Sequence, residues 1–265
     1  MRNGTIAFSA LRALRALRMV AALGGVFGAA CAVAAGLNDT GVTTCADASG
    51  ATVSCTAATA VQGQDARYGR DAAAGTGALT KVGGGANGFD FTKISNAGAV
   101  LPSTAPLGTG AGEWGCTYDN TTGLMWEVKT TSGLRNTTNS YSWYSSNATI
   151  NGGGVGFSSG GSCGITGRCD TEKFTQDVNA AGMCGHNDWR MPTLRELIGL
   201  TRFEIHGNFL LDGSYFPNPD GLYTWSGSPD TNNPNNAWFV GLYYGIFRSG
   251  SRINTNSIHL VRVGQ

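Results

Sequence analysis

Charged residues are scarce in this sequence. Asp, Glu, Lys and Arg make up 13% of the 265 residues, about half the usual share of about 25%. The 18 basic and 17 acidic residues leave a net charge of +1, and no stretch gathers Lys and Arg into a basic stripe. Nucleic-acid-binding domains carry such a stripe, so the composition argues against a nucleic-acid partner.

The sequence also lacks the motifs of common enzyme classes. It contains no P-loop, no dinucleotide-binding fingerprint and no H-E-x-x-H segment. A G-x-S-x-G match at residues 156–160 lies inside the Gly/Ser-rich run 151–164, whereas a nucleophile elbow needs a buried strand before the serine and a helix after it. His186 lies in a tight turn and His259 on an expected strand, where structural or solvated roles are typical. We therefore predict no catalytic residue and no enzyme.

A metal or cofactor site is not predicted either. No C-x-x-C pair exists, and His186 is the only histidine close to a cysteine, which argues against zinc. Asp212, Asp220 and Asp230 lie in loops rich in Asn, Gly and Pro, and their oxygens are ligands of the kind that Ca²⁺ takes. Their spacing matches no calcium loop, so a turn-forming role is favoured. We expect no cofactor and no metal.

The first 35 residues have the form of a secretory signal peptide. Four arginines precede the apolar, small-residue stretch 19–35, and Ala32-Val33-Ala34 fits a cleavage site. The stretch is too short and too rich in Gly and Ala for a membrane span of about 20 residues. Lipid attachment at Cys31 is an alternative. We expect an exported protein of the periplasm, the outer surface or the medium, with no membrane span in the mature chain.

The cysteines predict disulfides. Of the seven cysteines, six remain when Cys31 is removed with the signal peptide, and an even number in an exported chain indicates a disulfide framework. Closeness in the sequence favours two short-range pairs and leaves one long-range pair. The expected pairs are Cys45–Cys55, Cys163–Cys169 and Cys116–Cys184.

Composition divides the remaining chain near residue 113. Residues 36–112 are rich in Ala, Gly, Thr and Ser and contain few aromatics, so they offer little apolar surface against the entropy of ordering. We interpret them as a stalk or linker module that is loosely ordered. All six tryptophans lie between Trp114 and Trp238, so residues 113–265 are the expected folded domain.

Periodicity within residues 113–265 predicts an α+β fold. Residues 123–129 alternate between apolar and polar side chains as in a strand, and further strands are expected at 222–226, 237–242 and 257–263. Asp170 or Thr171 caps one expected helix, and Thr193 with Glu196 forms the capping box of a second. Strands around a helix pair indicate α+β architecture.

The last sixty residues combine aromatic rings with amide side chains, a mixture suited to sugars and other polar ligands. Trp225 and Trp238 lie on expected strands, where large aromatics are usually core. The segment that follows them is rich in Gly and Ser, and its large residues are expected to be exposed and to contact a ligand. The predicted ligand-binding residues are Tyr243, Tyr244, Phe247, Arg248, Arg252, Asn254 and Asn256.

A series of short motifs carries a family resemblance. In chain order they are DNTTGLMWE (119–127), YSWY (141–144), NDWRMPTLREL (187–197), YFP (215–217), YTWS (223–226), AWFV (237–240) and LVR (260–262). Together they resemble the domain at the C-terminus of the Legionella collagen-like adhesin, the Lcl C-terminal domain family, over roughly residues 113–265. The WRMPT segment is also similar to a motif of the formylglycine-generating enzyme family, but no cysteine pair follows Cys184, so that oxidase chemistry is not carried over.

The resemblance implies a C-type-lectin-like domain of a cell envelope or surface that binds an extracellular glycan or protein, as an adhesin does. It also implies a possible homo-oligomer, although the chain lacks collagen-like repeats. Two alternatives remain: a structural envelope or assembly protein without a small ligand, and a lectin-fold receptor that displays a variable C-terminal face.

Overall fold

The computed structural model describes residues 36–203, 210–218, 221 and 223–264. The expected signal peptide, including Cys31, lies outside these residues, as does Asp220. All described residues belong to one compact unit. Within the described residues, no helix combines the length and apolar character needed to cross a membrane.

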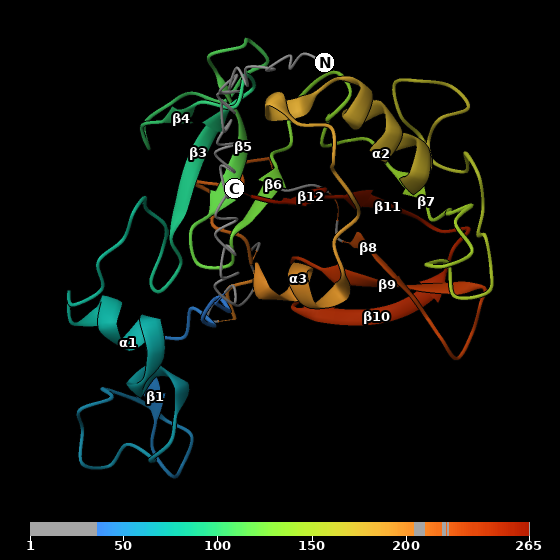
Figure 1. Cartoon of the computed structure of the whole chain (residues 1–265). Helices are drawn as coiled ribbons and strands as arrows, with labels where there is room; N and C mark the ends of the chain where they lie inside the picture. The colour runs from blue at the N-terminus through green and yellow to red at the C-terminus, as the bar shows by residue number, and fades with distance from the viewer. Residues whose placement is uncertain (1–35, 204–209, 219–220, 222, 265) are drawn as a thin grey trace, which may run out of the picture. The chain divides into compact units, whose positions relative to one another are not determined.

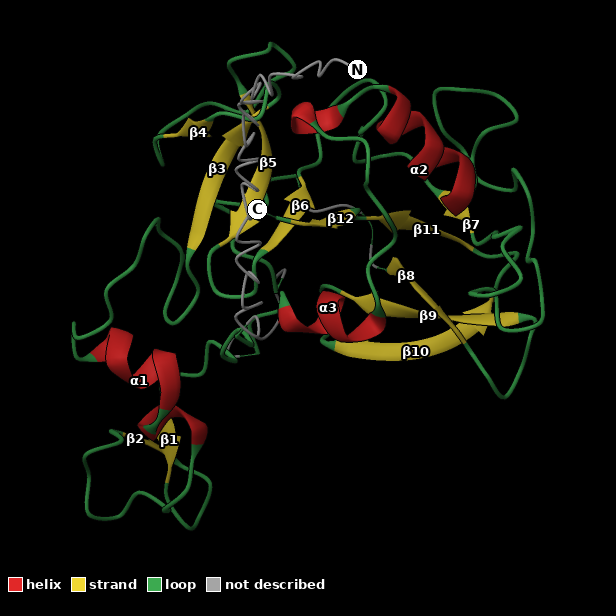
Figure 2. Cartoon of the chain, viewed as in Figure 1, coloured by secondary structure: helices red, strands yellow, loops and turns green. Residues whose placement is uncertain are grey.

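The strands and helices are drawn in Figures 1 and 2. The strands are β1 (Cys45–Ala46), β2 (Thr52–Val53), β3 (Phe91–Ser95), β4 (Val100–Leu101), β5 (Trp114–Asp119), β6 (Leu124–Glu127), β7 (Tyr141–Ser142), β8 (Thr224–Pro229), β9 (Asn236–Gly241), β10 (Ile246–Ser251), β11 (Thr255–Ile258) and β12 (Val261–Val263). The α-helices are α1 (Gly69–Gly75), α2 (Thr171–Ala180) and α3 (Leu194–Gly199), and two 3-10 turns are η1 (Asp65–Arg67) and η2 (Met183–Gly185).

Two five-stranded sheets form the body of the domain, with strand orders β12-β6-β5-β3-β4 and β10-β9-β8-β11-β7. All neighbours are antiparallel except β8 and β11, which are parallel. The last segment of the chain joins the two sheets, because β11 pairs with β7 and β8 whereas β12 pairs with β6. This mixed arrangement agrees with the expected α+β class and is compatible with a C-type-lectin-like fold.

Strand β6 contributes to two core clusters, because neighbouring residues of a strand point to opposite faces of the sheet. Met125 packs in one core cluster with Phe174 and Trp189. Trp126 packs in the other cluster, which contains Leu197 and several aromatic residues. The turn between β5 and β6 contains Gly123 at φ 72°, a left-handed backbone that glycine adopts without steric cost.

Both helices of the folded domain begin as expected. The buried Asp170 caps α2, since its carboxylate accepts a hydrogen bond from the Lys173 amide. Thr193 and Glu196 form the complete capping box of α3. These caps satisfy backbone amides that have no partner inside a helix.

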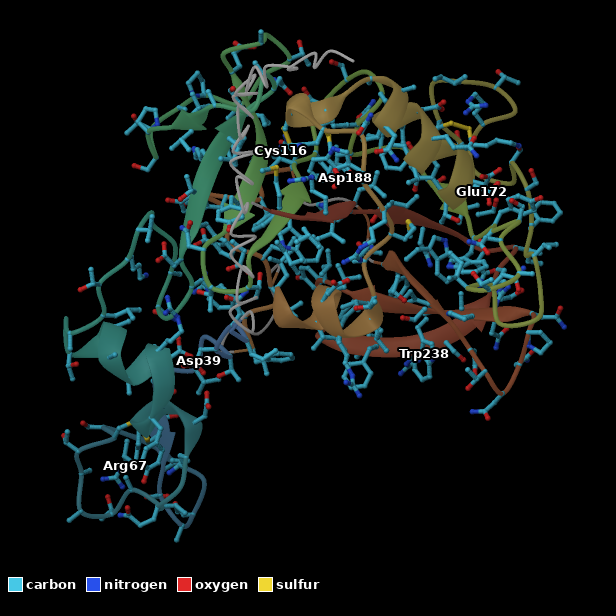
Figure 3. All side chains as sticks on the ribbon, in the orientation of Figure 1. Asp39, Arg67, Cys116, Glu172, Asp188 and Trp238 are labelled. Atoms are coloured by element: carbon cyan, nitrogen blue, oxygen red, sulfur yellow. A yellow bond between two sulfur atoms is a disulfide. The ribbon has the colours of Figure 1, made fainter. Side chains whose placement is uncertain are left out.

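The three expected disulfides are present: Cys45–Cys55, Cys163–Cys169 and Cys116–Cys184. The last one joins β5 to η2 across 68 residues of sequence, and Figure 3 labels Cys116. Cys116 and Cys184 are both fully buried in the core cluster that contains Phe174. The pairing predicted from sequence spacing is confirmed.

The structure differs from the expected stalk at residues 36–112. Strand β3 lies between β4 and β5 in the first sheet, and Phe89 and Phe91 are buried against Tyr215 and Phe216. The boundary predicted at residue 113 therefore cuts through a sheet. Composition was misleading because Phe89 and Phe91 point inward, and because buried carboxylates order the loops of this segment. The Asp71 carboxylate, for example, accepts the amides of Gly41 and Gly88.

Candidate ligand-binding cleft

A cleft of about 450 Å³ lies between one side of α2, the segment 143–150 and the segment 190–193. Its lining is mainly apolar and includes Trp143, Tyr144, Ile150 and Met191. Polar side chains from the loop and from α2 form its rim. Concave sites that combine an apolar lining with a few polar groups are the usual form of small-ligand sites.

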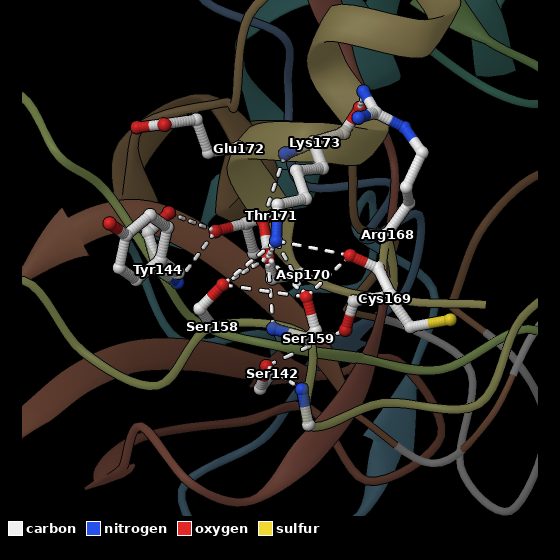
Figure 4. Close-up of polar contacts among 12 residues, drawn as sticks. Ser142, Tyr144, Ser158, Ser159, Arg168, Cys169, Asp170, Thr171, Glu172 and Lys173 are labelled. Atoms are coloured by element: carbon white, nitrogen blue, oxygen red, sulfur yellow. Dashed lines mark hydrogen bonds and ion pairs between the residues drawn. The ribbon is translucent and has the colours of Figure 1, made fainter. Parts of the chain in front are cut away.

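The first turn of α2 holds one wall of the cleft. The Tyr144 amide donates to Thr171 Oγ1 at 2.9 Å, and Thr171 Oγ1 donates to the Tyr144 carbonyl at 2.7 Å. The Ser146 amide and hydroxyl both donate to the Glu172 carboxylate, at 2.6 and 2.9 Å. Figure 4 shows Tyr144 and Glu172 together on one side of the helix start, with Arg168 on the other. The segment 143–150 is therefore held to α2 through two consecutive helix residues, Thr171 and Glu172.

A polar network around Asp170 fixes the Gly/Ser-rich loop beside this wall (Figure 4). Asp170 accepts the Ser159 amide at 2.9 Å and forms an ion pair with Lys173 at 3.2 Å. The Lys173 ammonium donates to the hydroxyls of Ser158 and Ser159, at 2.9 and 2.6 Å. These contacts hold in place the loop that contains the G-x-S-x-G match.

The loop 143–157 is supported from behind by Arg252, which is 1% exposed. Its guanidinium donates to the carbonyls of Asn236, Asn151 and Gly154. It also lies over the Trp143 ring, 4.0 Å from the centroid. Burial lowers the pKa of Arg252 from its ordinary value, and the nearby charge of Asp230 opposes that shift. Arg252 was predicted to contact a ligand, but the side chain is buried and is enclosed by three carbonyls from two segments of the chain.

The segment 190–193 forms the opposite wall. Arg190 donates to both oxygens of Glu196, at 2.8 and 2.6 Å. Burial of the Glu196 carboxyl raises its pKa, but the hydrogen bonds from Arg190 and Thr193 outweigh that effect, and its pKa lies below the ordinary value. The bidentate pair holds the start of α3 against the cleft and neutralises the Arg190 charge.

The family model of the Lcl C-terminal domain matches residues 115–262, which include every residue of the cleft. The chain belongs to the Lcl C-terminal domain family. No curated protein and no solved structure matches it.

Two motif segments of this Lcl C-terminal domain meet at the cleft, since 141–144 contributes Tyr144 and 187–197 contributes Arg190 and Thr193. Tyr144, Asn147 and Gln176 were not predicted as site residues. The sequence signal that could have indicated this site is that both segments belong to the ordered motif series of the family. Strands β3 and β4 lie outside the matched residues, although β3 is part of the same sheet.

The predicted ligand-binding residues of the Lcl C-terminal domain do not form one site. Tyr244 and Phe247 are 56% and 53% exposed, and Arg248 is also exposed. Tyr243 is half-buried, and Asn254 and Asn256 lie beyond the other end of β10. The Gly/Ser-rich segment is in fact the edge strand β10, which contains Phe247 and Arg248 near its start and ends at Ser251, before Asn254.

Other candidate residues have structural contacts. Trp225 is fully buried, whereas Trp238 is half-buried. The Asp212 carboxylate accepts the amides of Ala86 and Ser214, and Asp230 accepts that of Asn232. The contacts with Ser214 and Asn232 are local turn contacts of the kind that the sequence favoured, whereas the Ala86 contact joins Asp212 to a segment 126 residues away.

The described residues contain one further group of acidic side chains whose carboxylates lie within 4.8 Å of one another, formed by Asp39, Asp65 and Asp71. Asp39 accepts the Asp71 amide at 2.8 Å, and Asp65 accepts the Thr40 hydroxyl. Burial raises the pKa of Asp71, and the charges of Asp39 and Asp65 add to that effect. The cluster orders the segment before β3.

Proposed function

We propose that the chain is an exported binding protein of a cell envelope or surface, and that the cleft beside α2 receives an extracellular glycan or peptide. Membership of the Lcl C-terminal domain family relates it to an adhesin-type surface domain. Three disulfides are consistent with an oxidising compartment. The observation that carries the proposal is the apolar cleft, whose walls are fixed by the Thr171 and Arg252 contacts.

A binding role is favoured over catalysis by the chemistry of the cleft. The charged residues Glu172 and Arg190 are engaged by Ser146 and Glu196. General acid–base catalysis requires a group that is free to exchange a proton with the substrate. A prepared apolar surface whose charged side chains are held in hydrogen bonds supports recognition instead.

The test compares two tyrosine variants of the full chain, produced by export to an oxidising compartment. Wild type, Tyr144→Ala and Tyr244→Ala are applied to arrays of glycans and of extracellular-matrix proteins. Tyr144 lines the cleft, whereas Tyr244 is exposed beside the edge strand β10. We expect Tyr144→Ala to weaken binding at least about tenfold and Tyr244→Ala to leave it unchanged. Loss of binding in Tyr244→Ala alone would place the site at the C-terminal face and overturn the proposal.

A role in assembly is a second candidate function. Strand β10 is an edge of its sheet, and it presents the exposed Phe247 and only one charged residue, Arg248. Unprotected edges pair readily with another strand. Sedimentation measurements at rising concentration test this role: a self-associating protein should become monomeric in Phe247→Lys. A monomeric wild type would remove this candidate.

A further inference from the structure

We infer that a second cavity, which lies on the first sheet beside Arg262, binds a small ligand that carries a carboxylate on an apolar chain or aromatic ring. The cavity has a volume of about 630 Å³, within the range of small-ligand sites. No described residue lines both this cavity and the cleft beside α2. The inference is therefore independent of the function proposed for the cleft.

The floor of the cavity is a row of side chains across one face of the sheet. Thr92 on β3 pairs with Tyr118 on β5, and Tyr118 pairs with Met125 on β6. Met125 in turn pairs with Arg262 on β12. Side chains that pair across neighbouring strands share a face of the sheet, and all four line the cavity. The strand order β12-β6-β5-β3 places Arg262 at one end of the row and Thr92 at the other (Figure 1).

The buried Arg262 side chain leaves one edge of its guanidinium without an acceptor. Its Nε and Nη2 donate to the Asp188 carboxylate at 2.6 and 3.2 Å. Its Nη1 is shielded from water and has no hydrogen-bond partner among the described residues. A buried donor without an acceptor is unfavourable, and a ligand oxygen that enters the cavity supplies the missing acceptor. The edge formed by Nη1 and Nη2 matches the two oxygens of a carboxylate.

The charges around the cavity favour an anionic group at the Arg262 end. The described lining includes Lys93, whose ammonium donates to the Ala105 carbonyl at 3.0 Å, and contains no acidic residue. Asp188 offsets part of the Arg262 charge, but its side chain is 57% exposed, and water screens an exposed charge. Asp90 comes just before β3, at the other end of the row from Arg262.

The remainder of the lining suits an apolar chain or ring. Met125 and Tyr118 lie next to Arg262 along the floor, and Val100 and Leu101 of β4 add apolar side chains. Val100 is 73% exposed, so its apolar surface is available to a ligand. A ligand that lies along the row covers these side chains while its carboxylate reaches Arg262, and this combines an apolar contact area with one orienting charged contact.

His186 also lines the cavity, and it reports the charge at Arg262. Burial lowers the pKa of His186 from its ordinary value, the charge of Arg262 adds to that effect, and Asp188 opposes it. A carboxylate bound at Arg262 brings a negative charge toward the imidazole, so it should raise the pKa of His186. A neutral amide of the same shape should leave that pKa unchanged.

The test titrates the full chain, produced by export to an oxidising compartment, with phenylacetate, phenylacetamide and acetate. We expect wild type to bind phenylacetate at least about tenfold more tightly than phenylacetamide, and more tightly than acetate, which lacks the ring. Arg262→Gln should lose this preference. Asp188→Asn removes the competing negative charge, so it should tighten phenylacetate severalfold and leave phenylacetamide unchanged. Arg248→Gln is the control, because Arg248 is exposed on β10.

An NMR pH titration places the ligand within the chain. Phenylacetate, but not phenylacetamide, should raise the pKa of the imidazole signal that is absent from His186→Gln. Equal affinity for the two compounds, no binding of phenylacetate, or a preference that survives in Arg262→Gln would overturn the inference. If Arg262→Gln does not fold, Asp188→Asn and the His186 titration decide: unchanged phenylacetate affinity together with an unmoved pKa of His186 would be the contrary result.

Discussion

The Arg252 guanidinium lies over the Trp143 ring, with 4.0 Å between the guanidinium carbon and the ring centroid. Both residues are buried, at 1% and 2% exposure. The Trp143 amide also donates to the Arg252 carbonyl at 3.0 Å. The turn after β10 is thereby fastened to the loop that forms one wall of the cleft. Arg252 therefore helps to shape the cleft although its side chain is buried.

Replacement of Arg252 by methionine is expected to lower the free energy of unfolding by about 3 kcal/mol. The substitution removes three charge-assisted hydrogen bonds, each worth about 1.5–3 kcal/mol before any relaxation. Among the described residues it leaves the Gly154 carbonyl without a donor, whereas the Asn236 and Asn151 carbonyls still accept the amides of Asp230 and Gly154. Denaturant unfolding measures the change. Arg248→Met is the matched control, because Arg248 is exposed and surface substitutions usually stay within about 0.5 kcal/mol. Equal stability of the two variants would contradict the structural role of Arg252.

The long-range disulfide is expected to contribute more stability than the short one. In the chain-entropy model, the 68-residue separation of Cys116 and Cys184 corresponds to about 4 kcal/mol. The 6-residue separation of Cys163 and Cys169 corresponds to about 2 kcal/mol in the same model. Double alanine variants of each pair, compared by denaturant unfolding, test this order. A larger loss in the Cys163/Cys169 variant would show that the short bridge is needed for the loop and the Asp170 network.

The Arg190–Glu196 pair predicts a dependence of stability on pH. The folded-state pKa of Glu196 lies below its ordinary value of 4.5, so the ionised carboxylate stabilises the fold above that value. This contribution is lost as the pH falls through the folded-state pKa. The difference in unfolding free energy between wild type and Glu196→Gln should therefore shrink as the pH falls below 4.5. Glu113→Gln is a control at a second glutamate, and a difference for Glu196→Gln that is constant with pH would be the contrary result.

The sequence alone determined the features whose partners are close along the chain or are carried by an ordered series of motifs. The Thr193 and Glu196 box joins residues three positions apart, and a cap of that kind is a local interaction. The two short disulfides were predicted because their cysteines are close in the sequence. The long-range disulfide was predicted because Cys116 and Cys184 were the two cysteines that remained. Family membership followed from the order of the motif segments, whose residues the structure places in both sheets.

Only the tertiary structure decided which large or charged residues are exposed. Arg252 sits in a Gly/Ser-rich stretch that looks solvated, but its acceptors Asn151 and Gly154 are 101 and 98 residues away in the sequence. The cleft itself is assembled from the segments 143–150, 171–179 and 190–193. Burial and concavity arise when distant segments pack together, and no local pattern of residue types encodes which of them will meet.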